Sequence, residues 1–193
     1  LLIADGDDSL EIAKLRWGNL VPPSLAVNTP RYDPLREQSV SRSCRSGDGG
    51  VLWVGQPETN DCIQTLERVL PLMKSMGREL LFRAHPGDEG YGANAYARIL
   101  DRHHQKIRDV TQWPWPDCIH LNPALLLTQY SSLAVEAGFH GIPSVHLLYA
   151  DTGGQRLLEK KGYPIPPMCL HGAAFAITKQ GSEFEVLHVA LHD

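Results

Sequence analysis

Several features that mark other protein classes are scarce or absent in this 193-residue sequence. The four cysteines are far apart and form no Cys-x-x-Cys pair, so neither a zinc knuckle nor a disulfide framework is indicated, and we expect reduced thiols. No apolar run approaches the roughly 20 residues of a membrane span. The acidic residues that follow Leu1-Leu2-Ile3 are unlike a signal peptide. The sequence therefore predicts no transmembrane segment and a cytoplasmic location.

Positive charge and glycine-rich phosphate loops are also in short supply. The 18 Lys and Arg residues are outnumbered by 22 Asp and Glu, and the net charge of −4 argues against a general nucleic-acid binder, which needs a basic face. Neither a Gly-x-Gly-x-x-Gly sequence nor a Walker loop occurs, so dinucleotide binding and ATP hydrolysis lack their usual signatures. The adjacent His103 and His104 would not face one site on a helix, and we expect no metal site.

What is present is an alternation of short apolar runs with amphipathic segments. We expect strands at 1–4, 25–27, 51–54, 79–82, 107–111, 124–127, 144–149 and 173–178. The expected helices lie between them, at about 7–17, 59–76, 94–104, 117–121, 131–138, 153–161 and 183–191. Strands that alternate with helices predict the α/β class: a Rossmann-like three-layer domain with a mainly parallel sheet.

The composition also suggests how the chain is divided. Residues 36–50 are rich in Ser, Arg, Gly and Asp and contain almost nothing apolar, which predicts a linker or mobile loop. Residues 1–35 are then the tail of a preceding domain or a leading strand-helix segment, and 51–193 form a Rossmann-like nucleotide-binding domain. Because the chain opens without methionine in what resembles the middle of a fold, we expect a fragment of a longer protein.

Two helices carry testable local predictions. In the first, Ile12 and Leu15 are expected on one packed face. In the second, Pro71 should cause a kink or a break. That second helix is expected to be capped by Thr59, Asn60 or Asp61 and to bury a stripe of Ile63, Leu66, Leu70 and Met73.

The stretch 124–149 predicts a strand, a polar turn, a short helix and a second strand. Ser131 or Ser132 can cap the helix, and Pro143 blocks its continuation. Free backbone N–H groups, the positive helix end and two hydroxyls would then face the carboxyl edge of the sheet, where phosphate is a natural ligand. A serine that only caps the helix is the simpler alternative.

Two further loops should open onto the same edge, because ligands of open parallel sheets bind where the strands end and strand order reverses. One is Gly55-Gln56, and the other runs from Arg83 to Asp88. Within it, His85 next to Pro86 can donate to a phosphate, unless nearby backbone satisfies its ring. Trp113 and Trp115 can stack on a sugar or base, although packing of their loop onto the core is the favoured interpretation.

Together, the motifs Gly55-Gln56-Pro57, Arg83-Ala84-His85-Pro86 and Thr128-Gln129-Tyr130-Ser131-Ser132, followed by Glu136 and Gly141-Ile142-Pro143, resemble a known domain. It is the carboxyl-terminal nucleotide-sugar domain of GT-B glycosyltransferases, in the capsule-polysaccharide, sialyltransferase-like and glycerophosphotransferase-like branches. The UDP-N-acetylglucosamine 2-epimerases share the fold more distantly. The resemblance implies one half of a GT-B fold, with nucleotide and phosphate contacts from Gly55, Gln56, Arg83, His85, Pro86, Thr128, Tyr130, Ser131, Ser132 and Glu136. Of these, Glu136 would bind the ribose.

The resemblance also implies what this chain does and what it lacks. It would bind a nucleotide sugar or CDP-polyol donor, with no cofactor required, for transfer to an acceptor glycan in bacterial surface polysaccharide synthesis. The base that activates the acceptor lies in the amino-terminal domain of the sialyltransferase-like families, in an acidic-acidic-Gly motif. Asp5-Gly6 lacks the first acid, so we expect the base outside this chain. Alternatives are an epimerase-like enzyme and a non-catalytic nucleotide-binding module.

Overall fold

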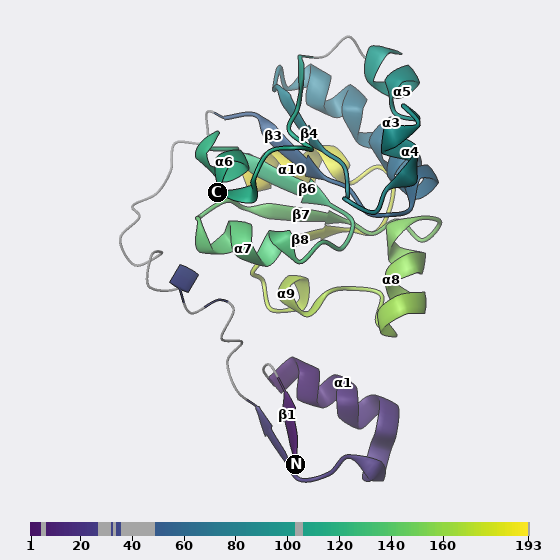
Figure 1. Ribbon diagram of the computed structural model, residues 1–193, viewed down its shortest axis with the longest axis vertical. Coiled ribbons are helices and arrows are strands. Elements are labelled where there is room, and N and C mark those ends of the chain that lie inside the picture. Colours follow the sequence, from purple (N-terminus) through teal and green to yellow (C-terminus); the bar gives the residue numbers. More distant parts are fainter. Residues whose placement is uncertain (5–6, 27–31, 33, 36–48, 103–105, 193) are drawn as a thin grey trace. The chain divides into compact units, whose positions relative to one another are not determined.

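The computed structural model describes residues 1–4, 7–26, 32, 34–35, 49–102 and 106–192 (Figure 1). The chain divides into two compact units, Leu1–Ser41 and Arg42–Asp193. Asp5-Gly6, Cys44, His103-His104 and most of the expected linker at 36–50 lie outside the described residues. The domain boundaries predicted from the sequence stay a prediction.

The first unit is a small strand-helix-strand element. Strands β1 (Leu2–Ala4) and β2 (Ser24–Ala26) pair in parallel, and α1 (Asp7–Trp17) and a 3₁₀ turn, η1 (Gly18–Leu20), connect them. The expected packed face is wrong at Leu15, which is 86% exposed, whereas Ala13 is buried. Two residues advance a helix by about 200°, which puts Leu15 nearly opposite Ala13.

The second unit is built on one parallel sheet with the strand order β5-β4-β3-β6-β7-β8. All five strand pairings are parallel, which confirms the α/β Rossmann-like fold class. The strands are β3 (Val51–Val54), β4 (Leu80–Arg83), β5 (Ile107–Asp109), β6 (Leu125–Thr128), β7 (Ser144–Leu147) and β8 (Phe175–Ile177). The helices are α3 (Thr59–Ser75), α4 (Glu89–Gly92), α5 (Ala97–Arg102), α6 (Trp115–His120), α7 (Leu133–Phe139), α8 (Gly153–Lys161), α9 (Pro167–Leu170) and α10 (Glu183–His192).

Helices cover both faces of this sheet (Figure 1). On one face, alternate strand residues such as Trp53 and Leu127 pack against α3, α5 and α10. On the other face, residues such as Leu52 and Leu126 pack against α6 and α7. Every residue of β3 and β6 is buried, as expected for central parallel strands that read as continuous apolar runs. The three-layer architecture follows from these two separate cores.

The order of the strands reverses at β3, which lies between β4 and β6. In the sheet register Val54 stands beside Arg83 on one side and beside Thr128 on the other. The last residues of three adjacent parallel strands are therefore level with each other. The three loops identified in the sequence do open onto one carboxyl edge, at the position where open α/β sheets bind their ligands.

Some element boundaries differ from those predicted. The helix expected from 94 begins at Ala97, because Asn94 takes a left-handed conformation (φ 59°) that does not start a helix. A short helix that was not predicted, α4, precedes it and is capped by Asp88, which accepts from the Gly90 N–H at 3.0 Å. Helix α6 begins two residues earlier than expected, and α9 was missed in a proline-rich stretch that starts at Pro164.

Helix α3 corrects two local predictions. Its N-cap is Glu58, which makes no side-chain cap bond, and the Thr59 hydroxyl donates instead to Asp88. The helix also continues through Pro71 to Ser75, so the predicted break is wrong, while a kink at Pro71 stays a prediction. Both Pro71 and Glu67, whose carbonyl loses its hydrogen bond to residue 71, are exposed, so water can satisfy that carbonyl. Of the expected stripe, Ile63 is only half-buried, while the other three residues are buried.

In the described part of the chain, no helix has both the length and the apolar character needed to cross a membrane.

Candidate functional site

The side chain of Thr128, at the end of β6, links two of the three loops. Its hydroxyl donates to the Val54 carbonyl at 2.8 Å. It also accepts from Gln56 Nε2 at 3.4 Å and from the Ser131 N–H at 3.3 Å. The residue is fully buried, so these bonds are shielded from water. The structure therefore brings together Gln56, Thr128 and Ser131, which the sequence predicted to share a site.

Close backbone packing holds the Gly55-Gln56 loop in place. The Gly55 N–H donates to the Arg83 carbonyl at 2.8 Å, and a Cβ at Gly55 would stand only 3.4 Å from that oxygen. The next N–H, of Gln56, donates to Cys62 Sγ at 3.2 Å. Burial raises the pKa of the Cys62 thiol to about 12, so this cysteine is a neutral structural partner rather than a nucleophile.

A residue that the sequence did not single out, Gln129, fixes the loop after β6. Its side chain is fully buried, and Nε2 donates to Thr65 Oγ1 at 2.8 Å and to the Asp61 carbonyl at 3.1 Å. Its backbone carbonyl accepts from His146 Nδ1 at 3.0 Å. The loop is thus tied both to the first turns of α3 and to β7. Only the long-range contacts reveal this role.

His146 is a buried neutral histidine next to the candidate site. Because Nδ1 contacts a carbonyl, it must carry the proton, and Nε2 is left as an acceptor. That Nε2 atom is buried and has no hydrogen-bond partner among the described residues. Burial lowers the pKa of His146 to about 4, so its ring stays neutral at physiological pH.

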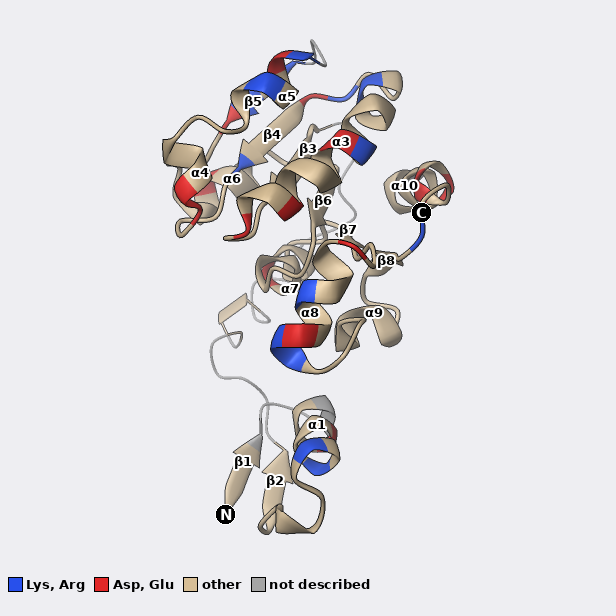
Figure 2. Ribbon diagram, turned by 90° about the vertical axis from the view of Figure 1, so that its right-hand side faces the viewer, with Lys and Arg blue, Asp and Glu red and all other residues tan. Residues whose placement is uncertain are grey.

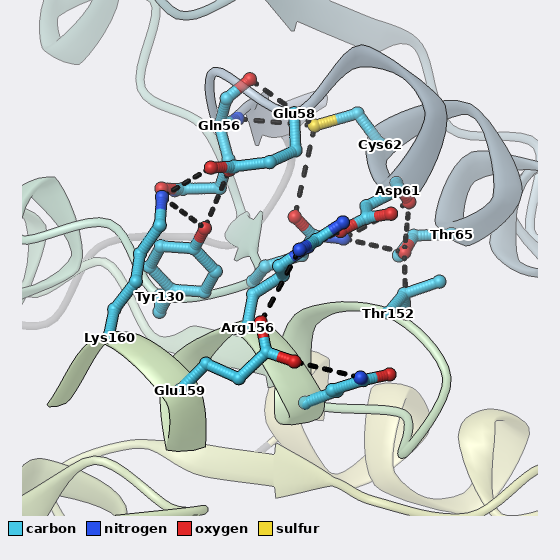
Figure 3. A network of polar contacts seen from close by, with 12 residues as sticks. Gln56, Glu58, Asp61, Cys62, Thr65, Tyr130, Thr152, Arg156, Glu159 and Lys160 are labelled. Carbon is cyan, nitrogen blue, oxygen red and sulfur yellow. Dashed lines mark hydrogen bonds and ion pairs between the residues drawn. The ribbon is translucent and has the colours of Figure 1, made fainter. Parts of the chain in front are cut away.

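Tyr130 takes part in a charged cluster at the mouth of the site. Its hydroxyl donates to Glu58 Oε2 at 2.7 Å, and Lys160 Nζ donates to the other carboxylate oxygen (Figure 3). Partial burial alone would raise the pKa of Glu58, but the hydrogen bonds from Lys160 and Tyr130 hold it below its ordinary value. Burial and the adjacent carboxylate raise the pKa of Tyr130. The predicted residue Tyr130 is therefore present at the edge, already bound to an acid.

The contact between Lys160 and Glu58 joins α8 to the residue that caps α3, and a second ion pair joins α8 to α3 itself. Arg156 Nε on α8 donates to Asp61 Oδ2 on α3 at 2.8 Å, and Arg156 also contacts Glu159 at 3.3 Å. Figure 2 shows basic and acidic segments close together along α8. The sequence predicted the helix at 153–161, but its acidic partners at the start of α3 lie nearly a hundred residues away, beyond the reach of any local pattern.

The two serines take different roles at the start of α7. The N-cap residue of α7 is Ser132, one of the predicted pair, but its exposed side chain makes no cap bond. Ser131 Oγ, one residue before the cap, accepts from the Leu133 N–H at 3.2 Å. Glu136 lies in the first turn and is half-buried. Because α7 has only seven residues, hydroxyls and loop N–H groups, rather than a long helix dipole, are what this loop offers a ligand.

Arg83 and His85, two of the predicted site residues, have different partners in the Arg83–Asp88 loop. Arg83 Nη1 donates to the carbonyls of Val110 at 3.0 Å and Trp113 at 2.7 Å, so this side chain braces the connector before α6. The imidazole of His85 stays close to its own loop, where Nδ1 accepts from the Gly87 N–H at 3.0 Å. The proton must then be on Nε2, which has no partner among the described residues and can donate to a ligand. Pro86 is exposed.

The two tryptophans of the connector behave differently. Trp115 is half-buried and packs against the core under α6 and α7, as the favoured interpretation predicts. Trp113 is 37% exposed, so that interpretation is wrong for this side chain. The reason is that Arg83 holds the Trp113 backbone carbonyl, which fixes the connector without burying the ring.

A hollow of about 590 Å³ lies at the opposite, amino edge of the sheet, and its lining includes Gly50, Glu79, Lys106 and Arg108. The Glu79 carboxylate already pairs with Arg108 at 3.2 Å and lies 3.8 Å from Lys106. This hollow contains none of the residues predicted from the sequence. The loops that form the candidate site converge at the carboxyl edge, away from this hollow.

Comparison with known proteins is informative about the fold alone. Neither a protein-family model nor a curated protein matches this sequence. Among solved structures, it is similar to the UDP-GlcNAc 2-epimerase of Methanocaldococcus jannaschii in complex with UDP-GlcNAc and UDP, at 15% identity and a TM-score of 0.53, over 83% of this chain and 42% of that one. Another structure of that enzyme gives a TM-score of 0.51 at 15% identity, over 83% and 43% of the two chains.

The wall teichoic acid polymerase TagF, as its H444N variant with CDPG, aligns at 18% identity and a TM-score of 0.49, over 98% of this chain and 47% of that one. This chain therefore spans less than half the length of each of these three structures. The likeness to the epimerase structures, together with the strand order, shows a Rossmann-like fold that corresponds to one half of a GT-B fold.

Proposed function

We propose that this chain is the donor-binding half of a GT-B-type transferase that uses a nucleotide sugar or a CDP-polyol. The observation that carries the proposal is the convergence of three loops at the point of strand-order reversal, with Val54, Arg83 and Thr128 level in the sheet. The fold shared with an epimerase whose structure contains UDP and UDP-GlcNAc supports it.

In this proposal the phosphates of the donor lie between two loops. The Nε2–H of His85 is directed by its bond to Gly87 and can donate to a phosphate oxygen. The hydroxyl of the exposed Ser132, together with loop N–H groups, can donate from the other side. Donors that are fixed before the reaction stabilise the charge on the departing phosphate. Glu136 would accept from the ribose hydroxyls.

The chemistry of the acceptor belongs to a second domain in this proposal. A GT-B enzyme catalyses its reaction in the cleft between two Rossmann-like halves, so the other half would supply the general base and bind the acceptor glycan. Synthesis of a bacterial surface polysaccharide in the cytoplasm is the corresponding biological role. No resident cofactor or metal is required, because the donor is itself the activated substrate.

Nucleotide binding tests the proposal directly. We expect UDP, CDP or CMP at millimolar concentration to shift the backbone amide resonances of Gln56, His85 and Ser132 in an ¹⁵N-labelled sample. The amide of Lys74, at the far end of α3, should not move. If none of the three nucleotides perturbs the three loop amides, the proposed donor site is wrong.

Two substitutions should weaken this binding without unfolding the chain. His85→Ala and Ser132→Ala each remove one proposed phosphate donor, and we expect each to cost about 1–3 kcal/mol of nucleotide binding free energy in calorimetric titrations. The matched controls are His120→Ala and Ser75→Ala, which change exposed residues at the ends of α6 and α3. Loss of stability in His85→Ala or Ser132→Ala, with unchanged binding, would instead show that the residue has a structural role.

An epimerase-like enzyme is the second candidate, favoured by the TM-score of 0.53 to the UDP-GlcNAc 2-epimerase. The two functions differ in their products, since an epimerase inverts a sugar centre and needs no acceptor. Incubating the intact two-domain protein with UDP-GlcNAc and analysing the sugar distinguishes them. Formation of the 2-epimer without an acceptor would favour this candidate over a transferase.

A further inference from the structure

Lys160 lies where the two loops of the proposed site meet. From α8 its ammonium reaches Glu58, which follows Gly55-Gln56-Pro57, and lies 3.5 Å from the hydroxyl of Tyr130, which precedes the serine pair (Figure 3). The ammonium is also 5.6 Å from the centroid of the Tyr130 ring. Lys160 was not among the residues identified in the sequence.

The ion pairs that join α8 to the start of α3 differ in how many carboxylates hold the cation. In the inner pair, the side chains of Asp61 and Arg156 are 12% and 44% exposed, and Arg156 contacts two carboxylates, Asp61 at 2.8 Å and Glu159 at 3.3 Å. The next residue after Arg156, Leu157, is buried and anchors the middle of α8. In the outer pair, the side chains of Glu58 and Lys160 are 21% and 45% exposed, and among the described residues Glu58 is the one carboxylate in an ion pair with Lys160. Exposed ion pairs contribute little to stability, so Lys160 can leave Glu58 at small cost while α8 stays in place.

A diphosphate at this edge would need a cation that is free to reach it. Among the described residues, Arg83 is held by the carbonyls before α6 and Arg156 is held by Asp61. His85 is neutral in the tautomer that its bond to Gly87 imposes. Lys160, in contrast, pairs with the single carboxylate of Glu58 and contacts residues next to both loops, Glu58 and Tyr130.

We propose that Lys160 exchanges the Glu58 carboxylate for the second phosphate of a nucleoside diphosphate, so that the donor is an NDP-linked compound rather than a CMP-linked one. This inference rests on the proposed function. A single phosphate is met by the loop donors, whereas the second carries the additional charge that attracts an ammonium. Glu58 keeps Lys160 ordered over the loops until the donor binds.

Substitution of Lys160 tests the preference for diphosphates. In calorimetric titrations, Lys160→Gln should bind UDP and CDP about tenfold more weakly than the wild type, because it loses a charge-assisted hydrogen bond but no longer has to break an ion pair. UMP and CMP should bind within about twofold of wild type. Lys160→Arg should restore most of the diphosphate affinity. Lys74→Gln, the same change at the exposed end of α3, is the control and should alter nothing.

Substitution of Glu58 tests the exchange itself. Glu58→Gln keeps an oxygen that can accept from Tyr130 but frees Lys160 from its partner. We expect it to strengthen diphosphate binding by about threefold, and to have no such effect in the Lys160→Gln background. Weaker diphosphate binding by Glu58→Gln, or equal effects in the two backgrounds, would overturn the exchange.

The outcomes separate this inference from the function on which it rests. If the wild type binds UDP or CDP and Lys160→Gln binds them equally well, only the role of Lys160 is wrong. If the wild type binds monophosphates as tightly as diphosphates, the NDP-linked donor is wrong, although the nucleotide site remains. If no nucleotide binds to the wild type, the proposed function is overturned together with this inference.

Discussion

Replacing Gly154 by alanine is expected to lower the free energy of unfolding by about 3 kcal/mol. A Cβ at this position would stand 2.4 Å from the Leu148 carbonyl oxygen and 2.9 Å from that of Tyr149. These are backbone atoms of the loop that follows β7, so neither can rotate away. The start of α8 would have to move off the sheet, against the small gain in helix propensity that alanine brings.

Gly138 on α7 provides a matched control. A Cβ there would meet nothing within 4 Å, and the residue is exposed. Gly138→Ala should therefore leave stability unchanged or raise it by up to about 1 kcal/mol. Urea denaturation followed by the fluorescence of the tryptophans, which include the fully buried Trp53, measures both variants. Equal stability of the two variants would show that the approach of α8 to β7 is not restrictive.

Acidification should destabilise the protein through His146. Its pKa is about 4 in the folded state against 6.5 for an ordinary histidine. As pH falls below 6.5, the unfolded chain takes up a proton that the folded ring does not accept until about pH 4. The neutral ring therefore stabilises the fold fully above pH 6.5, and we expect about 3 kcal/mol to be lost by pH 4. Denaturation midpoints measured across this range should fall steadily.

His146→Asn isolates this contribution because an asparagine amide can still donate to the Gln129 carbonyl but does not titrate. Between pH 6.5 and 4 the variant should lose less stability than the wild type by about 3 kcal/mol, whatever its stability at neutral pH. Exposed His120 is the control: His120→Asn should keep the slope of the wild type. Parallel curves for the wild type and His146→Asn would show that the buried ring is protonated as easily as a free one.

Gly154 and His146 both affect the candidate site, because His146 contacts Gln129 and Gly154 lies next to a residue that packs against Gln129. His146 holds its carbonyl, and a Cβ at Gly153, next to Gly154, would stand 2.8 Å from its Cβ. The same residue locks the Thr128–Ser132 loop to α3 through Thr65. A shift of α8 would therefore disturb the loop and also displace Lys160. The close packing of the first turn of α8 is what sets the position of that cation.

Local patterns in the sequence were sufficient for most of the fold and for the sheet edge at which the loops of the candidate site meet. Continuous apolar runs marked β3 and β6 because both of their faces are buried. Alternating strands and helices predicted the parallel sheet, and in such a sheet all the loops after strands must reach one edge. The turn that precedes α7 is likewise local, since the Ser131 hydroxyl accepts from the Leu133 N–H only two residues away.

Tertiary structure alone decided which side chains at that edge are already hydrogen-bonded within the protein and which can bind a ligand. Arg83 and His85 belong to one motif, yet the connector before α6 takes the guanidinium and leaves the His85 Nε2–H available. Glu58 and Lys160 are 102 residues apart and meet because α8 packs against α3, whose N-cap residue is Glu58. Periodicity and capping depend only on residues that are close in the sequence. Pairings such as that of Glu58 and Lys160 depend instead on the strand order and on how closely Gly153 and Gly154 allow α8 to approach the sheet.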